Sequence, residues 1–492
     1  IVPHNAIGAG VARYGHALRR RGEQKCHARR DERYNRGDIT AHIPEAELST
    51  PPIANAPAQA VPAHYRRNLF LLVGDFVFFV VGITFINGQT VLPDFVGRLA
   101  GSEVLVGLVS ITFPLGVILP QLAFAPVVAR SKAKRLWVLW PGIPGRMMVF
   151  VPAIAIVAFG ADQPLLLVMV VFLSVGFFAA CDGISALGWL DLIGMVLPNE
   201  RRGRMFGIGR MISSLIILFI VSDLMRQILA PEIGPSFPYD YALLFALGAV
   251  CLVVSVVAFI FIREHHSPDA EALQVPARRD YLAFLRSVLR DDRSYRRYLT
   301  TRVIAEVALI ATPFYIRFAT ESLGIPSADA VSGAIQMSTL GGVIAGLGLG
   351  WLSERRGSRL VILVGALVMV AQPITALVAG GTGMTWLIYL AFAIGGMTFA
   401  AIEPGLLNWI IEYADNSRRA IYYSLTSTIN FVAVLSPLLG GLIAERLSYE
   451  VLFVVALALA LITLAMALSL IEPRKQRLGV EAEFAVGRAG KS

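Results

Sequence analysis

The sequence predicts an all-α polytopic membrane protein with twelve transmembrane helices. Hydrophobic residues make up 56% of the 492 residues and charged residues only 16%, which is too apolar for a soluble protein. Apolar windows recur along the chain, and each approaches or exceeds the about 20 residues that a helix needs to cross the hydrocarbon. A polar link separates two sets of six windows. They lie at 69–92, 103–128, 136–159, 164–190, 205–229, 241–262, 299–320, 331–352, 360–379, 384–410, 420–443 and 450–471.

The arginines alternate between the two sides of this pattern. Few of them lie in or beside the odd-numbered connections: Arg98, Arg226, Arg317 and Arg446. The even-numbered connections are rich in them, at 130–135, 201–204, 263–297, 355–359 and 418–419. Because cytoplasmic loops carry the excess of Lys and Arg, both termini are predicted to be cytoplasmic and the protein to lie in the plasma (cell inner) membrane. The net charge of +9 follows from the same loops, so no nucleic-acid partner is expected.

The parts outside the windows predict the domain organisation. Residues 1–64 carry basic and Pro/Ala-rich stretches without an apolar core of signal-peptide length, and they indicate a disordered cytoplasmic tail or upstream sequence outside the functional protein. Two six-helix bundles are expected at 65–263 and 298–471, followed by a cytoplasmic tail at 472–492. Within the link at 264–297, apolar residues share one helical face, which fits either a helix at the membrane surface or a solvated linker.

A short basic turn between the eighth and ninth windows has the spacing G-x-x-x-D-R-x-G-R, with a glutamate at the acidic position. The matching residues are Gly350, Glu354, Arg355, Gly357 and Arg359. This motif resembles the loop between the second and third helices of a major facilitator superfamily half. The first glycine is expected to let a neighbouring helix approach, and the second to permit a tight turn. An earlier copy around Arg130 keeps the basic charge but lacks both glycines and the acid.

The fourth and tenth windows end alike, which indicates a duplication. Each carries two acids nine residues apart, followed by arginine: Asp182, Asp191 and Arg202 in the first half, and Glu403, Glu412 and Arg419 in the second. Such similarity predicts two bundles related by a pseudo-two-fold axis, as the resemblance implies. Nine helical residues turn by about 180°, so the first acid of each pair is expected to face a cavity and the second the loop arginines. The final glutamate and arginine also resemble the sugar-porter branch, without identifying a sugar.

Ionisable residues inside the windows are candidates for function, because a charge at mid-bilayer costs at least about 2.5 to 3.5 kcal/mol. Those singled out as candidates are Asp75, Arg146, Asp182, Arg210, Glu306 and Glu403. The resemblance implies that helices one, four, seven and ten line the central cavity, and each of these carries one of the four acids. We therefore expect proton-coupled transport, with Glu306 and Asp182 as the first choices for the proton site. Asn87 and Gln121 are candidate cavity residues that could equally join helices.

Other functions remain as alternatives to a secondary transporter of a small solute. The fold would also suit a transport-inactive receptor or scaffold, and among transporters a facilitative sugar-type uniporter rather than an efflux antiporter. A membrane enzyme is not expected, because no histidine lies in the windows and the cysteines are isolated. No cofactor or metal is expected. The predicted partners are a small-molecule substrate, protons and the lipid bilayer, for a monomer.

Overall fold

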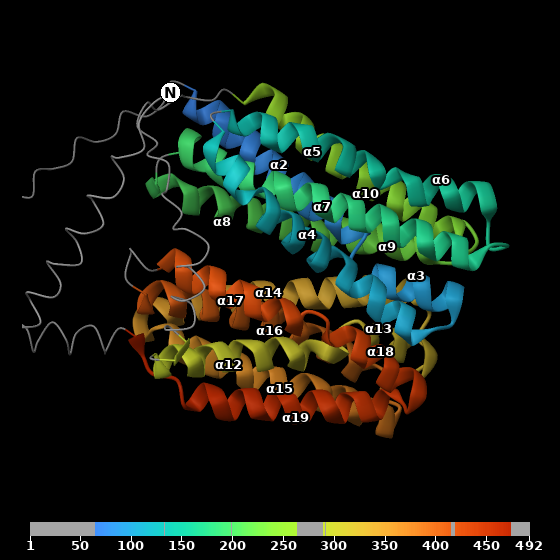
Figure 1. The fold of residues 1–492 in the computed structure, drawn as a ribbon. Coiled ribbons are helices and arrows are strands. Elements are labelled where there is room, and N and C mark those ends of the chain that lie inside the picture. Colours follow the sequence, from blue (N-terminus) through green and yellow to red (C-terminus); the bar gives the residue numbers. More distant parts are fainter. Residues whose placement is uncertain are drawn as a thin grey trace, which may run out of the picture. The chain divides into compact units, whose positions relative to one another are not determined.

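The computed structural model describes residues 64–131, 133–197, 199–262, 289–290, 292–414 and 419–473. All regular secondary structure in these ranges is helical, and twelve spans there are long and apolar enough to cross a membrane (Figure 1). The predicted count of twelve is therefore confirmed. The predicted tails and most of the predicted link at 264–297 lie outside the described residues.

Six spans form the first half. Their elements are α2 (Tyr65–Phe85), α3 (Val91–Ala100), α4 (Glu103–Arg130), α5 (Lys134–Met148) with α6 (Phe150–Phe159), α7 (Pro164–Val196), α8 (Asn199–Ile216) with η1 (Ile217–Val221) and α9 (Ser222–Leu229), and α10 (Tyr239–Val257) with η2 (Ala258–Phe261). Within this half, α2 packs against α10 and α8, and α7 packs against α4 and α5.

Six spans also form the second half. Their elements are α12 (Arg293–Ala308) with η3 (Leu309–Ala311) and α13 (Phe314–Glu321), α14 (Ser327–Arg356), α15 (Ser358–Thr382), α16 (Trp386–Tyr413), α17 (Arg419–Ala433) with α18 (Ser436–Arg446), and α19 (Tyr449–Leu468). Here α16 packs against α14 and α15, and α12 packs against α17 and α19.

The first span is shorter than predicted, because the window 69–92 includes a turn. Helix α2 ends at Phe85, and α3 begins at Val91. Between them the side-chain oxygen of Asn87 accepts a hydrogen bond from the backbone N–H of Gln89 (2.8 Å), a local bond that favours a turn over a helix. The seventh span is interrupted in the same way, between Ala308 and Phe314. Spans one and seven correspond in a duplicated chain, so the interruptions repeat as well.

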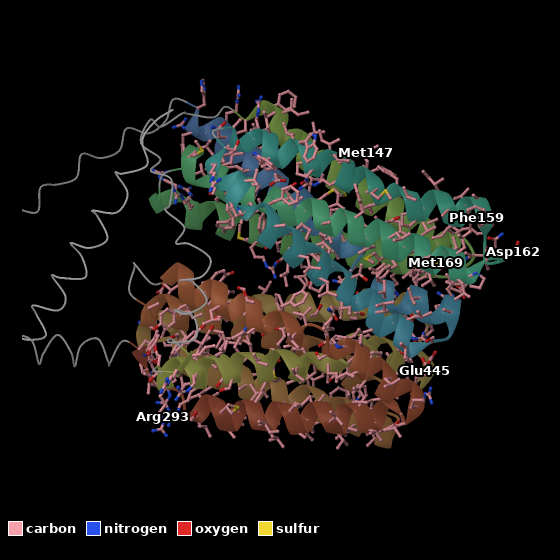
Figure 2. All side chains as sticks on the ribbon, in the orientation of Figure 1. Met147, Phe159, Asp162, Met169, Arg293 and Glu445 are labelled. Carbon is pink, nitrogen blue, oxygen red and sulfur yellow. The ribbon has the colours of Figure 1, made fainter. Side chains whose placement is uncertain are left out.

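The surfaces of the spans have the apolar character that lipid requires. Met147, Phe159 and Met169, labelled in Figure 2, are 42–55% exposed. Aromatic rings fill the interior of the second half instead. Tyr298 stacks on Trp409 with ring centroids 4.5 Å apart, and Trp409 stacks on Tyr413 at 4.6 Å. These stacked rings fix α12 against α16, the two helices that carry the charged cluster described below.

The two halves contact each other at one end of the spans. Helix α4 packs against α18, α3 against α13, and α9 against α14. In Figure 1, α3, α13 and α18 lie together at this end. We call it the Arg317 end, where Glu103, Arg317 and Glu445 lie. The opposite end, with Arg130, Arg202 and Arg355, is called the Arg355 end.

Candidate functional site

Three charged residues of the second half meet inside the spans. Arg302 of α12 places one guanidinium nitrogen 2.6 Å from a carboxylate oxygen of Glu403 on α16. The other terminal nitrogen lies 3.5 Å from a carboxylate oxygen of Glu306, one helical turn further along α12. The side chains of Arg302, Glu306 and Glu403 are 15%, 22% and 36% exposed. The cluster therefore holds two acids and one cation, and its acids are partly exposed.

Asn430 of α17 completes this cluster. Its side-chain nitrogen donates to the Glu306 carboxylate at 3.2 Å. Its side-chain oxygen is buried and has no hydrogen-bond partner within the described chain. The cluster thus joins the seventh, tenth and eleventh spans, and it offers one unused acceptor beside its acids.

The acid of the first span has a different environment. Asp75 of α2 is 3% exposed, and both of its carboxylate oxygens accept hydrogen bonds. Trp189 of α7 donates from its indole N–H at 2.9 Å, and Ser255 of α10 donates from its hydroxyl at 2.6 Å. Asp75 therefore holds three helices of the first half together, and its burial separates it from any solute in the cavity.

The remaining charges predicted in the first half do not form a contact like that of Arg302. Arg146 of α5 is 5% exposed, and two of its nitrogens lack a hydrogen-bond partner in the part that the structure describes. It interacts electrostatically with Asp75 and with Asp182 of α7, which is partly buried. Arg210 is exposed on α8 and Gln121 is partly buried on α4. Asn87 forms the turn described above.

The loop motif in the second half has the predicted turn. Gly357 has a φ of +86°, a conformation that glycine adopts without the strain of a side chain. Arg355 places its guanidinium 4.4 Å from the centre of the Trp351 ring, and Arg359 donates to the carbonyl of Leu468 at 3.0 Å. Glu354 lies at the end of α14.

The expectation for Gly350 is wrong in this structure. Among the residues that the structure describes, no atom of another helix lies within 4 Å of the position that a Cβ would occupy there. The reason is that α14 contacts the first half chiefly at the opposite end, through α9 and η1.

In the first half, the acid at the helix end contacts another group than expected. Asp191 pairs with Lys134 at 2.7 Å rather than with an arginine. Arg202 donates to the backbone carbonyls of Leu197 and Gly194, at the carboxyl end of α7, where cations are favoured. The hydroxyl of Ser358 donates to Glu412 at 2.7 Å. Arg130 is exposed at the end of α4, and Arg419 begins α17.

Sequence reasoning missed Arg302, whereas Asn430 belongs to the polar positions expected either to bind a substrate or to join helices, and it joins α17 to α12. A signal for Arg302 was present, because it lies four residues before Glu306, a spacing at which opposite charges pair on a helix. The contact with Glu403 had no signal in the sequence, because it depends on how α12 and α16 face each other. The structure therefore brings Glu306 and Glu403 together and leaves Asp75 and Asp182 in the other half.

Comparisons with known proteins agree with this architecture. Residues 74–435 match the family model described as Major Facilitator Superfamily. The chain belongs to the major facilitator superfamily. It is thus a secondary transporter by family, in an integral membrane fold of twelve spans.

Relatives of this superfamily chain include uncharacterized proteins of mycobacteria. The uncharacterized protein Rv2209 of Mycobacterium tuberculosis and the uncharacterized protein Mb2232 of Mycobacterium bovis are each 26% identical over 430 residues. Each match covers 85% of this chain and 79% of the relative.

Solved structures show the same fold at low identity. A mutant of the nucleoside transporter NupG has a TM-score of 0.63 at 12% identity, with 82% of this chain and 99% of that chain covered. A peptide transporter POT mutant has a TM-score of 0.60 at 15% identity, covering 81% and 94%. A D-xylose-proton symporter has a TM-score of 0.58 at 13% identity, covering 82% and 98%. These likenesses support the predicted twelve-helix fold of two six-helix bundles.

Proposed function

We propose that this transporter moves a small solute by alternating access and couples the movement to protons at the cluster of Arg302, Glu306 and Glu403. The observation that supports this proposal is the partial exposure of two acids and one cation within apolar spans. An exposed charge that faced lipid would cost several kcal/mol, so these side chains favour a water-filled space between the halves.

The charges of the cluster give the proton a defined place. With both acids ionised, the cluster has one negative charge more than Arg302 compensates. A proton on either carboxylate removes this excess and leaves one ion pair. Asn430 holds the Glu306 carboxylate, whereas Glu403 is the most exposed of the three. We therefore assign proton exchange with water to Glu403, and its partner Arg302 then remains paired with Glu306.

The same argument gives Asp75 a structural role. Its two hydrogen bonds satisfy both oxygens within the protein, and burial keeps water away. Asp182, a first choice from the sequence, has no contact comparable to that between Arg302 and Glu403. The proposed proton site therefore moves to the second half.

The test begins with a ligand. Sugars, drugs, siderophores and organic ions are screened by thermal shift on the purified protein, because a ligand that binds the folded state raises its melting temperature. The ligand found is then followed into proteoliposomes with and without an inward proton gradient. Glu403→Gln is expected to abolish proton-driven accumulation while exchange of labelled ligand across the membrane continues.

Asp162→Asn is the matched control, because Asp162 is an exposed acid in the loop before α7 (Figure 2). Its accumulation should equal that of the unmodified protein. Proton-driven accumulation that survives in both Glu403→Gln and Glu306→Gln would contradict the proton site. Exchange without any accumulation in the unmodified protein would favour a facilitative uniporter. A ligand that binds and never crosses would favour a receptor.

A further inference from the structure

Arg317 links the two halves at the Arg317 end. It lies on α13 and is 2% exposed. Its Nε donates to a carboxylate oxygen of Glu103 at 3.1 Å, across the boundary to α4. Another of its nitrogens pairs with Glu321, one turn further along its own helix. Gly97 of α3 faces the guanidinium so closely that a Cβ there would overlap it. The arginine is thus enclosed by both halves.

Glu445 forms a second link at the same end. It lies on α18, and one carboxylate oxygen accepts from the hydroxyl of Ser102 at 2.8 Å and from the backbone N–H of Val104 at 3.0 Å. Both donors belong to the start of α4, where unpaired N–H groups and the helix dipole favour an anion. Figure 2 shows Glu445 at this end of the second half.

The backbones themselves touch between these links. A Cβ on Gly107 of α4 would lie 3.0 Å from the carbonyl carbon of Pro437. A Cβ on Gly441 of α18 would lie 3.0 Å from the Cα of Val104. Only glycine permits this approach, so the polar links hold a contact that leaves no room for water.

A cavity of about 560 Å³ lies beside Arg317. Residues of both halves line it, including Arg98 and Asp240 from the first half, and Arg317 and Glu321 from the second. Arg317 thus forms part of the wall of this cavity, although only 2% of its surface is exposed. A third contact, between Arg226 and Asp329 at 2.8 Å, has side chains that are 62% and 39% exposed, so it adds little.

We propose that Glu103, Arg317 and Glu445 form a latch that keeps the Arg317 end closed and releases it during transport. The inference rests on the proposed transport cycle for its purpose. The latch can open reversibly because Arg317 also pairs with Glu321 of its own helix, and this pair stays intact when the halves separate. Glu103 then enters water, and no charge is left buried without a partner. Glu103 and Glu445 are positioning residues, which act on the halves and not on the solute.

The test measures a distance and needs no solute. Asp162 and Met384 are exposed in loops that the course of the chain places at the Arg317 end, one in each half. Both are changed to Cys and spin-labelled after the native cysteines are replaced by Ser, and the full-length protein is reconstituted in lipid nanodiscs. Double electron–electron resonance then gives the populations of short and long distances between the labels.

The latch predicts a mainly short distance in the parent protein. The double variant Glu103→Gln with Glu445→Gln removes both carboxylate charges. It should raise the ratio of long to short distances at least about tenfold, because the hydrogen bonds that these carboxylates accept between the halves lose their charged acceptor. Glu445→Gln alone, at an exposed position that tolerates change, should raise it about threefold. Glu450→Gln, an exposed acid of the same end, is the control and should leave the ratio unchanged.

An unchanged ratio in the single and double variants, with elution and melting like those of the parent, overturns the latch. Should the double variant fail to fold, the single variant decides alone. These outcomes are separate from the solute assay. If the protein transports a solute but the distances between the labels are unchanged by Glu445→Gln, only the latch is contradicted. If these distances lengthen but no solute is transported, only the proposed function is contradicted.

Discussion

Arg302 is predicted to couple energetically to Glu403, and this can be measured before any solute is known. The perturbations are Arg302→Gln, Glu403→Gln and the double variant. Each single change removes the ion pair that joins α12 to α16. In this pair a guanidinium nitrogen of Arg302 lies 2.6 Å from a carboxylate oxygen of Glu403. The double variant leaves two neutral amides at the same positions. If the pair contributes to stability, the double variant is less destabilised than the sum of the single changes.

The structure sets the magnitude of this coupling. Breaking a fully buried ion pair costs about 3–5 kcal/mol, whereas an exposed pair is worth about 0–1 kcal/mol. Arg302 is 15% exposed and Glu403 is 36% exposed, so solvent screens the pair in part. We expect a coupling energy of about 1–2 kcal/mol. Arg302→Gln should be the more destabilising single change, because it also leaves Glu306 beside Glu403 without a cation.

The assay is thermal unfolding of the purified protein in one detergent at one scan rate, because unfolding of such proteins is commonly irreversible. At about 2 cal/mol/K per residue, the unfolding entropy of a chain of this size is about 1 kcal/mol/K, so this coupling energy corresponds to about 1–2 °C of non-additivity in Tm. Strict additivity of the two single changes, within about 0.3 °C, would refute the pairing of Arg302 with Glu403. It would also remove the main support for the proposed proton site.

Two further predictions concern stability. Trp189→Phe should lower the free energy of unfolding by about 1–3 kcal/mol, because the buried carboxylate of Asp75 loses an indole donor. Trp140→Phe, at a ring that is 72% exposed, should change the same thermal melt little, and equal losses would contradict a special role for the Asp75 contact. Gly357→Ala should lower Tm, because its φ of +86° costs a residue with a side chain about 1–2 kcal/mol. Gly346→Ala, within α14 and facing open space, should instead raise stability by about 0.5–1 kcal/mol, and a higher Tm for the first variant than for the second would count against this account.

The charged residues show where sequence reasoning stops. The hydropathy pattern predicted the same role for Asp75 and Glu403, because each is an acid inside an apolar window on a span expected to line a cavity. The structure separates them, because Asp75 is buried and receives donors from α7 and α10, while Glu403 is partly exposed and pairs with Arg302. Which face of a helix an acid occupies depends on the rotation of that helix against its neighbours. A nine-residue spacing gives the relation between two acids of one helix, but not the partner of either.

Local patterns in the sequence alone determined the twelve spans, the alternating basic loops, the duplicated helix ends and the turn at Gly357. Each of these depends on the length of an apolar stretch or on the backbone conformation of one residue. The tertiary structure decided the rest, including the cluster around Arg302 and the contacts of Arg317 and Glu445 at the Arg317 end. Those contacts join helices that are far apart in the sequence, and they exist because close packing brings particular faces of these helices together.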